Sequence, residues 1–215
     1  MAVIKGFTTR DIERYINLLV DKHKDDFNPY LGVYEEWIKN CGEHDGSMTA
    51  RGILTKKYSW AIPNMEALRC IAEYSPILEV GAGTGYWASL LSKMNVTIRA
   101  VDNRPPLRLR PNLYGHKEQH FKVVRGNYGE VYDWPKSTLF LCWPPGCSSA
   151  VSSECLYAYH GKILLYVGEY ANGCTGDNVF HDTLAKDWVR IHQQAIPMWF
   201  GMCDSLFVYR RKIRS

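Results

Sequence analysis

Three glycines at alternate positions follow a short apolar run that ends beside an acidic side chain. The run covers residues 76–80, and the acid and the glycines are Glu79, Gly81, Gly83 and Gly85. Glycine lets a backbone turn sharply and approach a ligand without a clash at Cβ. Residues 87–94 then carry apolar side chains at helical spacing, and the first turn of such a helix offers free N–H groups. The pattern predicts a strand, a tight turn and a helix that together bind a nucleotide.

A second acid stands at the end of the next apolar run. Residues 96–102 are typical of a strand, and Asp102 closes it twenty-one residues after Gly81. In a βαβ unit an acidic side chain at this place accepts hydrogen bonds from the ribose hydroxyls of a bound nucleoside. The alternative is an aspartate that only begins a turn. The glycine spacing also departs from the dinucleotide fingerprint, because the third glycine follows Gly81 by four residues rather than five.

A pair of prolines stiffens the exit of a later strand. Residues 137–143 form an apolar run that ends at Trp143, and Pro144 and Pro145 follow it. Proline fixes φ, so the carbonyl groups here are held in place. Acceptors that are already in place need no reorganisation during a reaction. We expect either a corner that faces the substrate or an ordinary strand exit made rigid by prolines.

The segment from Glu79 to Gly85 resembles motif I of the Rossmann-like (class I) S-adenosylmethionine-dependent methyltransferases. The resemblance covers about residues 58–210 and implies that S-adenosylmethionine is the cofactor. It also implies that Glu79 and the glycines hold the cofactor and that Asp102 binds its ribose. Asn127, which follows a run at 121–125 that is typical of a strand, is expected at the edge of the adenine. Cys142 is expected beside the cofactor.

A segment upstream of motif I bears a more distant resemblance to the amino-group methyltransferases that act on nucleic acids. Residues 57–63 look like motif X of that family, and a helix and then the first strand follow them. The resemblance implies that Tyr58, Ser59 and Trp60 line the methionine end of the cofactor.

The double proline resembles another motif of the same amino-group methyltransferases. That family carries Asp or Asn, then two prolines, then an aromatic residue, and the polar side chain and a carbonyl accept hydrogen bonds from the target amine. Here Trp143 stands at the polar position and Gly146 at the closing aromatic position. Because the side-chain acceptor is absent, the resemblance does not establish transfer to nitrogen.

Trp143, Pro144 and Glu169 are the candidate catalytic residues. Glu169 lies just past an apolar strand predicted at 162–167, where ligands collect in open α/β sheets. It could take a proton from a nucleophile or bind a cationic substrate, as could Asp133. A loop glutamate without a catalytic role is the alternative, because methyl transfer to a neutral nucleophile needs mainly alignment.

Alternating strands and helices must position these residues. The predicted fold is α/β: a Rossmann-like, seven-stranded, mostly parallel sheet with a terminal antiparallel hairpin, as the resemblance implies. Residues 1–57 are predicted to form a helical N-terminal extension, whose first helix is capped by Thr9 or Asp11. Residues 58–215 are predicted to form the methyltransferase domain.

Length and composition limit the remaining possibilities. A chain of 215 residues with 46% hydrophobic residues can bury one substantial core. No apolar run approaches the ~20 residues that cross a bilayer. The seven cysteines lack paired spacing and are expected to be reduced thiols. We therefore expect a cytoplasmic protein without a membrane partner, and His116 and His120 are not expected to hold a metal because no further ligand stands at metal spacing. The oligomeric state is left open.

Three classes of function remain open. The first is a methyltransferase whose substrate is a small molecule or an exposed nucleotide or RNA group. The second is a partner or scaffold protein that binds the cofactor without catalysis, and the third, an oxidoreductase that uses a nicotinamide, is disfavoured by Glu79 and the glycine spacing. The net charge of +4 is too small to predict a basic surface that binds duplex DNA. Arg104, Arg108 and Arg110 belong either to a solvated loop or to a basic flap that meets phosphates or an acidic substrate.

Overall fold

A single seven-stranded sheet organises the molecule, for which a computed structural model describes residues 7–42, 46–107, 111–112, 114–146, 149–170 and 173–213. The strands follow the order β3-β2-β1-β4-β5-β7-β6. Their bounds are β1 Ile77–Val80, β2 Ile98–Asp102, β3 Val123–Arg125, β4 Thr138–Cys142, β5 Ile163–Gly168, β6 Trp188–Ala195 and β7 Ser205–Arg211. The first five strands run parallel, whereas β7 is antiparallel to both β5 and β6. The predicted fold class, with its terminal antiparallel hairpin, is confirmed.

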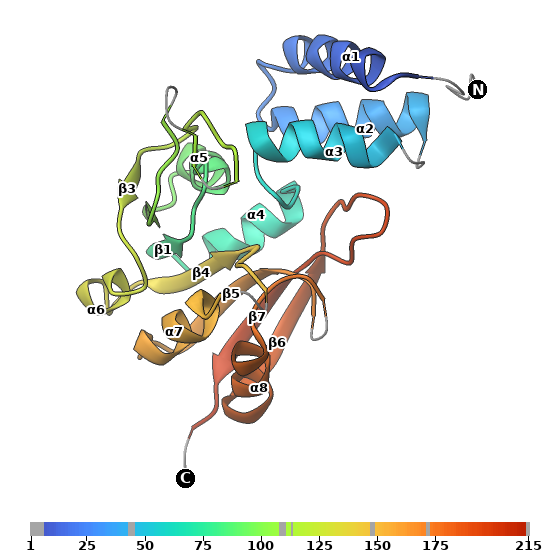
Figure 1. The fold of residues 1–215 in the computed structure, drawn as a ribbon. Helices are drawn as coiled ribbons and strands as arrows, with labels where there is room; N and C mark the ends of the chain where they lie inside the picture. Colours follow the sequence, from blue (N-terminus) through green and yellow to red (C-terminus); the bar gives the residue numbers. More distant parts are fainter. Residues whose placement is uncertain are drawn as a thin grey trace.

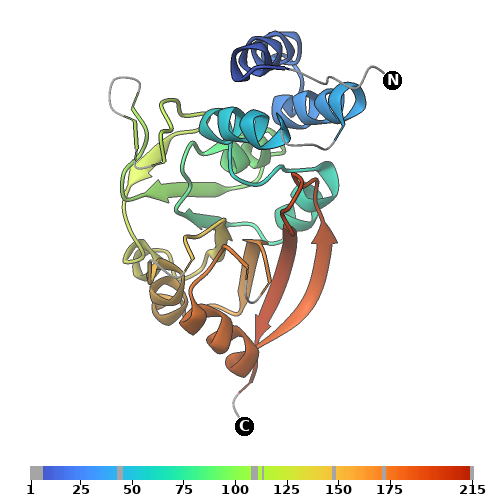
Figure 2. The ribbon, with the colours of Figure 1, turned by 45° about the vertical axis from the view of Figure 1, so that its right-hand side comes forward.

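Helices cover both faces of this sheet (Figures 1 and 2). Their bounds are α1 Thr9–Lys22, α2 Pro29–Cys41, α3 Gly46–Lys57, α4 Met65–Ala72, α5 Tyr86–Lys93, α6 Glu130–Asp133, α7 Val151–Ala158 and α8 Asn178–Asp187. Alternate residues of a strand point to opposite faces, and the strands divide accordingly. Phe140 and Val208 pack with α1 to α5, whereas Leu139 and Phe207 pack with α6 to α8.

Helices α1 to α3 share their core with the sheet. Ile16 of α1, Trp37 of α2 and Leu54 of α3 belong to the same buried cluster as Phe140 and Val208 of the strands. This continuity means that the helical N-terminal region, predicted as residues 1–57, has no core separate from that of the sheet.

Local polar contacts fix where these helices begin. Thr8 caps α1, one residue before the predicted Thr9, and its side chain and that of the predicted Asp11 form a reciprocal capping box. Asn28 caps α2 ahead of Pro29. Its amide also donates to the Pro63 carbonyl over 2.7 Å and accepts from the Tyr86 hydroxyl over 2.8 Å. One buried side chain thereby joins α2 to the segment before α4 and to the first residue of α5.

Candidate functional site

The three glycines after β1 form a left-handed turn. Gly81, Gly83 and Gly85 have φ values of 77°, 56° and 70°, a region that other residues adopt only with strain. A Cβ at Gly81 would meet no atom within 4 Å, whereas one at Gly85 would lie 2.9 Å from Val123 of β3. Gly85 is therefore needed for packing, and Gly81 borders open space that suits a ligand.

Asp102 reaches back to this turn from the end of β2. Its Oδ2 accepts a hydrogen bond from the Gly83 N–H over 3.0 Å, and its Oδ1 accepts one from the Arg104 N–H over 2.8 Å. Burial raises the pKa of Asp102, and the two backbone donors partly oppose that rise. Asp102 therefore lies beside the glycine turn, and its role at a ribose stays a prediction. The partly exposed carboxylate retains lone pairs for a further donor such as a ribose hydroxyl.

Glu79 lies beneath the turn and is only 1% exposed. Burial and the neighbouring charge of Asp102 raise its pKa to about 8, against one backbone hydrogen bond from Ala88 that lowers it. Its Oε2 has no hydrogen-bond partner. A buried acid of this kind is neutral at pH 7 and would ionise beside a positive charge.

The segment that resembles motif X lies against the turn, but its three residues have different surroundings. The Tyr58 carbonyl accepts a hydrogen bond from the Thr84 hydroxyl, while the Tyr58 ring is buried against Tyr30 and Tyr86. Ser59 donates to the Ala61 carbonyl over 2.7 Å. Trp60 is partly exposed. Tyr58 and Ser59 therefore support the local structure, and Trp60 has the accessible ring.

A histidine covers part of the same turn. The Cε1 atom of His116 lies 3.2 Å from the place that a Cβ on Gly83 would take, and burial lowers the pKa of this histidine. His120 extends the contact, because its backbone N–H donates to the Thr84 carbonyl over 2.8 Å and its Nε2 lies 2.7 Å from the Lys57 carbonyl. The sequence pattern pointed to no role for His116 and His120 beside the glycine turn. The described part of the chain contains no group of three side chains that could hold a metal ion.

The strand exit at Trp143 is strained. Trp143 has φ of +51°, which is uncommon for a bulky residue and is found where surrounding contacts impose it. Its backbone N–H donates to the Val167 carbonyl over 2.8 Å, and its indole N–H donates to Asp204 Oδ1 over 2.7 Å. The preceding Cys142 lies among Glu79, Asp204 and Ala61, and burial raises the pKa of its thiol well above the usual range.

One of the two departures from the double-proline motif, Gly146, has a physical explanation. Gly146 is required because a Cβ there would lie 2.6 Å from the Cys174 carbonyl oxygen. The Pro144 carbonyl accepts a hydrogen bond from the Gly176 N–H over 3.0 Å. The prolines therefore brace the loop that follows β5, and one lone pair of the Pro144 carbonyl is already used.

Asp204 supplies a carboxylate beside Trp143 that sequence reasoning missed. It is 5% exposed and immediately precedes β7. Burial and the charge of Glu169 raise its pKa to about 6, while the Trp143 hydrogen bond and the charge of Arg51 oppose that rise. Arg51 was missed as well. Neither residue carries a local sequence signal, because only the fold brings α3 and the end of the β6–β7 connection to Trp143.

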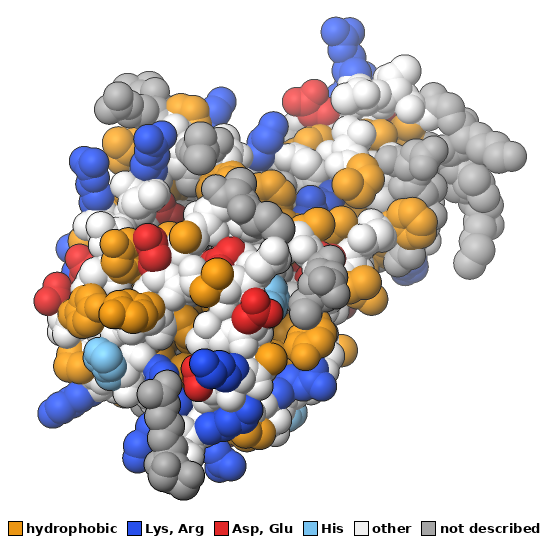
Figure 3. All heavy atoms as spheres, turned by 60° about the horizontal axis from the view of Figure 1, so that its bottom comes forward, with side chains coloured by type: hydrophobic (Ala, Val, Ile, Leu, Met, Phe, Trp, Pro, Cys, Tyr) orange, Lys and Arg blue, Asp and Glu red, His pale blue; other side chains and the backbone are white. Residues whose placement is uncertain are grey.

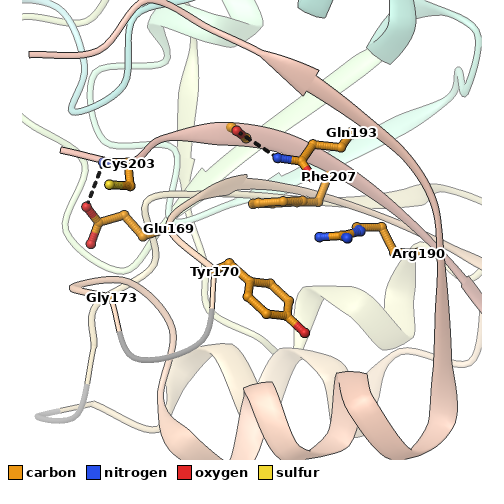
Figure 4. Close-up of a pocket in the computed structure, with 8 residues that line it drawn as sticks. Glu169, Tyr170, Gly173, Arg190, Gln193, Cys203 and Phe207 are labelled. Carbon is orange, nitrogen blue, oxygen red and sulfur yellow. Dashed lines mark hydrogen bonds between the residues drawn. The ribbon is translucent and has the colours of Figure 1, made fainter.

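Glu169 joins this group to a neighbouring pocket. Its Oε1 accepts from the Cys203 N–H over 2.9 Å and its Oε2 from the Cys174 N–H over 2.6 Å. A pocket of about 560 Å³ extends from Glu169 and Cys203 along the terminal hairpin, where Arg190 stacks on Tyr170 and Phe207 (Figure 4). Glu169 thus holds two loops together at the sheet edge, and its catalytic role stays a prediction.

The remaining sequence candidates lie at other places. Asn127 is exposed after β3 and accepts a hydrogen bond from the Gly129 N–H over 2.8 Å, while the adjacent Gly126 N–H donates to the Asp102 carbonyl over 3.0 Å. This contact brings the Asn127 segment beside Asp102. Asp133 ends the short helix α6 and is exposed. Arg108 and Arg110 lie outside the described residues, so the structure places only Arg104 of the predicted flap.

Two further expectations concern the cysteines and the length of the helices. The cysteines within the described residues are free thiols, namely Cys41, Cys70, Cys142, Cys155, Cys174 and Cys203. In the same part of the chain, the helices are too short or too polar to cross a membrane.

Comparisons with known proteins yield matches in structure only. No protein-family model matches the chain, and no curated protein matches it in sequence. A mutant of MtNAS in complex with S-adenosylmethionine is 8% identical, with a TM-score of 0.49 and coverage of 96% of this chain and 93% of that one. Magnesium protoporphyrin IX methyltransferase (ChlM) from Synechocystis PCC 6803, with bound S-adenosylmethionine, is 9% identical (TM-score 0.46; 92% and 97% covered). The 23S rRNA methyltransferase ErmE is 18% identical (TM-score 0.40; 70% and 69% covered).

Proposed function

We propose that the protein is an S-adenosylmethionine-dependent methyltransferase whose substrate is a small molecule or an exposed nucleotide or RNA group. One observation carries the proposal: Glu79, the left-handed glycine turn and Asp102 meet at the ends of β1 and β2. The direct contact between Asp102 Oδ2 and the Gly83 N–H, at 3.0 Å, joins the two sequence motifs into one site. Ligands of open α/β sheets bind at this edge.

The residues present fit this cofactor. Open space beside Gly81 leaves room for backbone contact with a ligand. Asp102 can accept hydrogen bonds from ribose, and the buried Glu79 with its unpaired Oε2 suits a ligand that carries positive charge. When bound, S-adenosylmethionine would supply the methyl group on its cationic sulfur to the lone pair of an acceptor, with S-adenosylhomocysteine as the leaving group.

Asp204 gives the acceptor side the polar group that position 143 lacks. Trp143 donates its indole N–H to one oxygen of Asp204 and so fixes the carboxylate next to the strand exit. With a pKa of about 6, Asp204 is mostly ionised at neutral pH. It can therefore accept a hydrogen bond or a proton from an amine or hydroxyl substrate, which favours catalysis over a purely structural role.

Transfer of a labelled methyl group tests the proposal. The purified protein is incubated with methyl-labelled S-adenosylmethionine and with separate pools of RNA, protein and small metabolites. We expect label in the RNA or metabolite pool, and loss of that label with Asp204→Asn, while cofactor binding stays unchanged. Cofactor binding without transfer to any pool would favour the alternative, a scaffold protein that has kept the fold without the chemistry.

A further inference from the structure

Arg51 of α3 is a buried cation with unused hydrogen-bond donors. It is 8% exposed, and its Nε and Nη2 atoms are buried without a hydrogen-bond partner. Among the described residues no carboxylate lies within ion-pair distance of it. Burying such donors without partners is unfavourable, so an arrangement of this kind points to a missing ligand.

Two tryptophans hold the guanidinium in place. Its Cζ lies 5.2 Å from the ring centroid of Trp60 and 5.0 Å from that of Trp143. The two indole rings stack with centroids 5.3 Å apart and planes 10° apart. Cation–π contact offsets part of the cost of burying the charge, but ring faces do not satisfy the N–H groups of the fork.

The free donors are the pair that recognises a carboxylate. Nε and Nη2 lie on one edge of the planar guanidinium, and two parallel N–H groups match the two oxygens of a carboxylate. Asp204, the nearby carboxylate, accepts instead from the indole N–H of Trp143. The fork of Arg51 is therefore available while the protein's own acid is engaged elsewhere.

Arg51 also lies near the loops beside β5 and β7. Its charge acts on Asp204, which precedes β7, and on Cys174, which follows β5. Trp143 ends β4, between these strands and β1. Trp143 therefore puts this cluster at the exit of the strand next to β1, and the proposal takes that exit as the acceptor side of the site.

We propose that Arg51, held by Trp60 and Trp143, is a binding subsite for a carboxylate group of the methyl acceptor. The identification of the ligand as the acceptor rests on the proposed methyltransferase function, whereas the carboxylate site itself rests on the geometry of Arg51. Both tryptophans are partly exposed whereas the fork itself is buried, so a carboxylate must enter from the side of their rings. The acceptor class is thus a small organic acid rather than a neutral molecule.

Titration with benzoate tests this subsite. Benzoate and its neutral analogue benzamide are added to the full-length protein at constant ionic strength. Binding is followed by tryptophan fluorescence and by the NMR signal of the Arg51 Nε–H. We expect benzoate to bind at least about tenfold more tightly than benzamide and to shift the Nε–H signal, since a charged acceptor is worth ~1.5–3 kcal/mol. Arg51→Gln should remove that preference.

Arg99 provides a matched control. Its Cζ lies 5.0 Å from the Trp134 ring centroid, but its Nη2 pairs with Glu130 over 3.0 Å. Arg99→Gln should leave benzoate binding within about twofold of the wild type, because that site already has its carboxylate. If Arg51→Gln does not fold, Arg51→Lys, which keeps the charge but lacks the fork, should lose most of the preference.

A second titration separates the two possible sources of the carboxylate. S-adenosylhomocysteine, which carries a carboxylate of its own, is added to saturation before benzoate. We expect benzoate to bind with unchanged affinity, as an acceptor subsite requires. Competition between the two would assign Arg51 to the cofactor's carboxylate and overturn the proposal, as would equal binding of benzoate and benzamide. Benzoate binding with no cofactor binding at all would support the carboxylate site and refute the proposed function.

Discussion

Trp143 occupies the position at which the resembled enzymes carry a hydrogen-bonding side chain. A carboxylate from a distant part of the chain lies beside it instead. Its indole N–H binds Asp204, which lies 61 residues further along the sequence. The strained φ of +51° shows that the surrounding contacts impose this orientation. The position of Trp143 could be read from the adjacent prolines. The roles of Asp204 and Arg51 could not, because they depend on contacts between separate elements.

Glu79 and Asp102 were predictable because the glycine spacing marks the end of the first strand and a βαβ unit places an acid at the end of the next one. The parallel register of β1 and β2 pairs Val80 with Val101 and so places the glycine turn beside Asp102. Neither the hydrogen bond from the Gly83 N–H nor the neutral state of Glu79 was predictable, since both depend on burial within the folded protein.

Binding of S-adenosylmethionine should release protons through Glu79. The pKa of this acid is about 8 in the free protein, so it is largely protonated at pH 7. The positive charges of the cofactor favour its ionised form, which lowers that pKa on binding. Calorimetry in buffers with different ionisation enthalpies should show proton release near pH 7 for the wild type and little for Glu79→Gln. Equal release in both proteins would exclude Glu79 from the site.

Strands and long helices of this chain were predictable because their apolar patterns are regular. The order of alternating elements and the terminal hairpin formed by β6 and β7 follow from those patterns and from the family resemblance. Helix α7 was not recognised, because Ser152 is buried and bonded to Asp177 while Tyr157 is 84% exposed. Such inversions break the amphipathic period on which recognition depends. Helix α6 is too short, at four residues, to show a period.

The glycine turn can be tested with a pair of matched variants. Gly81 and Gly42 have φ values of 77° and 73°, and a Cβ at either would meet no atom within 4 Å. Alanine in the left-handed region costs roughly 1–2 kcal/mol, so both variants should lose similar stability in thermal unfolding. Only Gly81→Ala should also lose affinity for S-adenosylmethionine, because its methyl group enters the space beside the turn. Equal cofactor affinity in Gly81→Ala, Gly42→Ala and the wild type would contradict the placement of the cofactor.

One continuous core joins the N-terminal helices to the sheet. Changes at the ligand-binding edge are therefore expected to alter the stability of the whole molecule. Buried acids contribute to this link. Glu79 and Asp204, with raised pKa values of about 8 and 6, are each more easily accommodated in the protonated form. The buried His116 and the partly buried His120, whose pKa values are lowered, act in the opposite direction.

The contribution of Glu79 to stability should fall as pH rises. Its folded pKa lies above the unfolded value of 4.5, so the folded state binds the extra proton between pH 4.5 and about 8. That contribution is complete below pH 4.5 and is lost as pH approaches 8. Glu79→Gln should therefore gain stability relative to the wild type across this window, on the order of 4 kcal/mol at its upper end. Denaturant unfolding at pH 5 and 8.5 measures the gain, and a difference that does not change with pH would contradict it.

The surface of the molecule bears on the choice between a small molecule and RNA. Basic, acidic and hydrophobic side chains are intermixed on the face that carries α6 to α8 (Figure 3). If RNA is nevertheless the substrate, its affinity should fall steeply from about 50 to 200 mM salt, because each phosphate contact releases counterions. Replacement of Arg104, Arg108 and Arg110 by alanine should then weaken RNA binding and spare the cofactor. Filter binding measures both effects. An RNA affinity that changes neither with salt nor on the triple replacement would exclude RNA as the substrate.

Calorimetric titration with S-adenosylmethionine tests the central claim most directly. We expect saturable binding of one cofactor molecule to each chain and no binding of NAD. Asp102→Ala should weaken cofactor binding by about 1.5–3 kcal/mol, because a charged hydrogen-bond acceptor is lost. Asp133→Ala, which removes an exposed acid from α6, should bind like the wild type. An absence of binding to the wild type, or equal affinity in the wild type and Asp102→Ala, would contradict the assignment of this site.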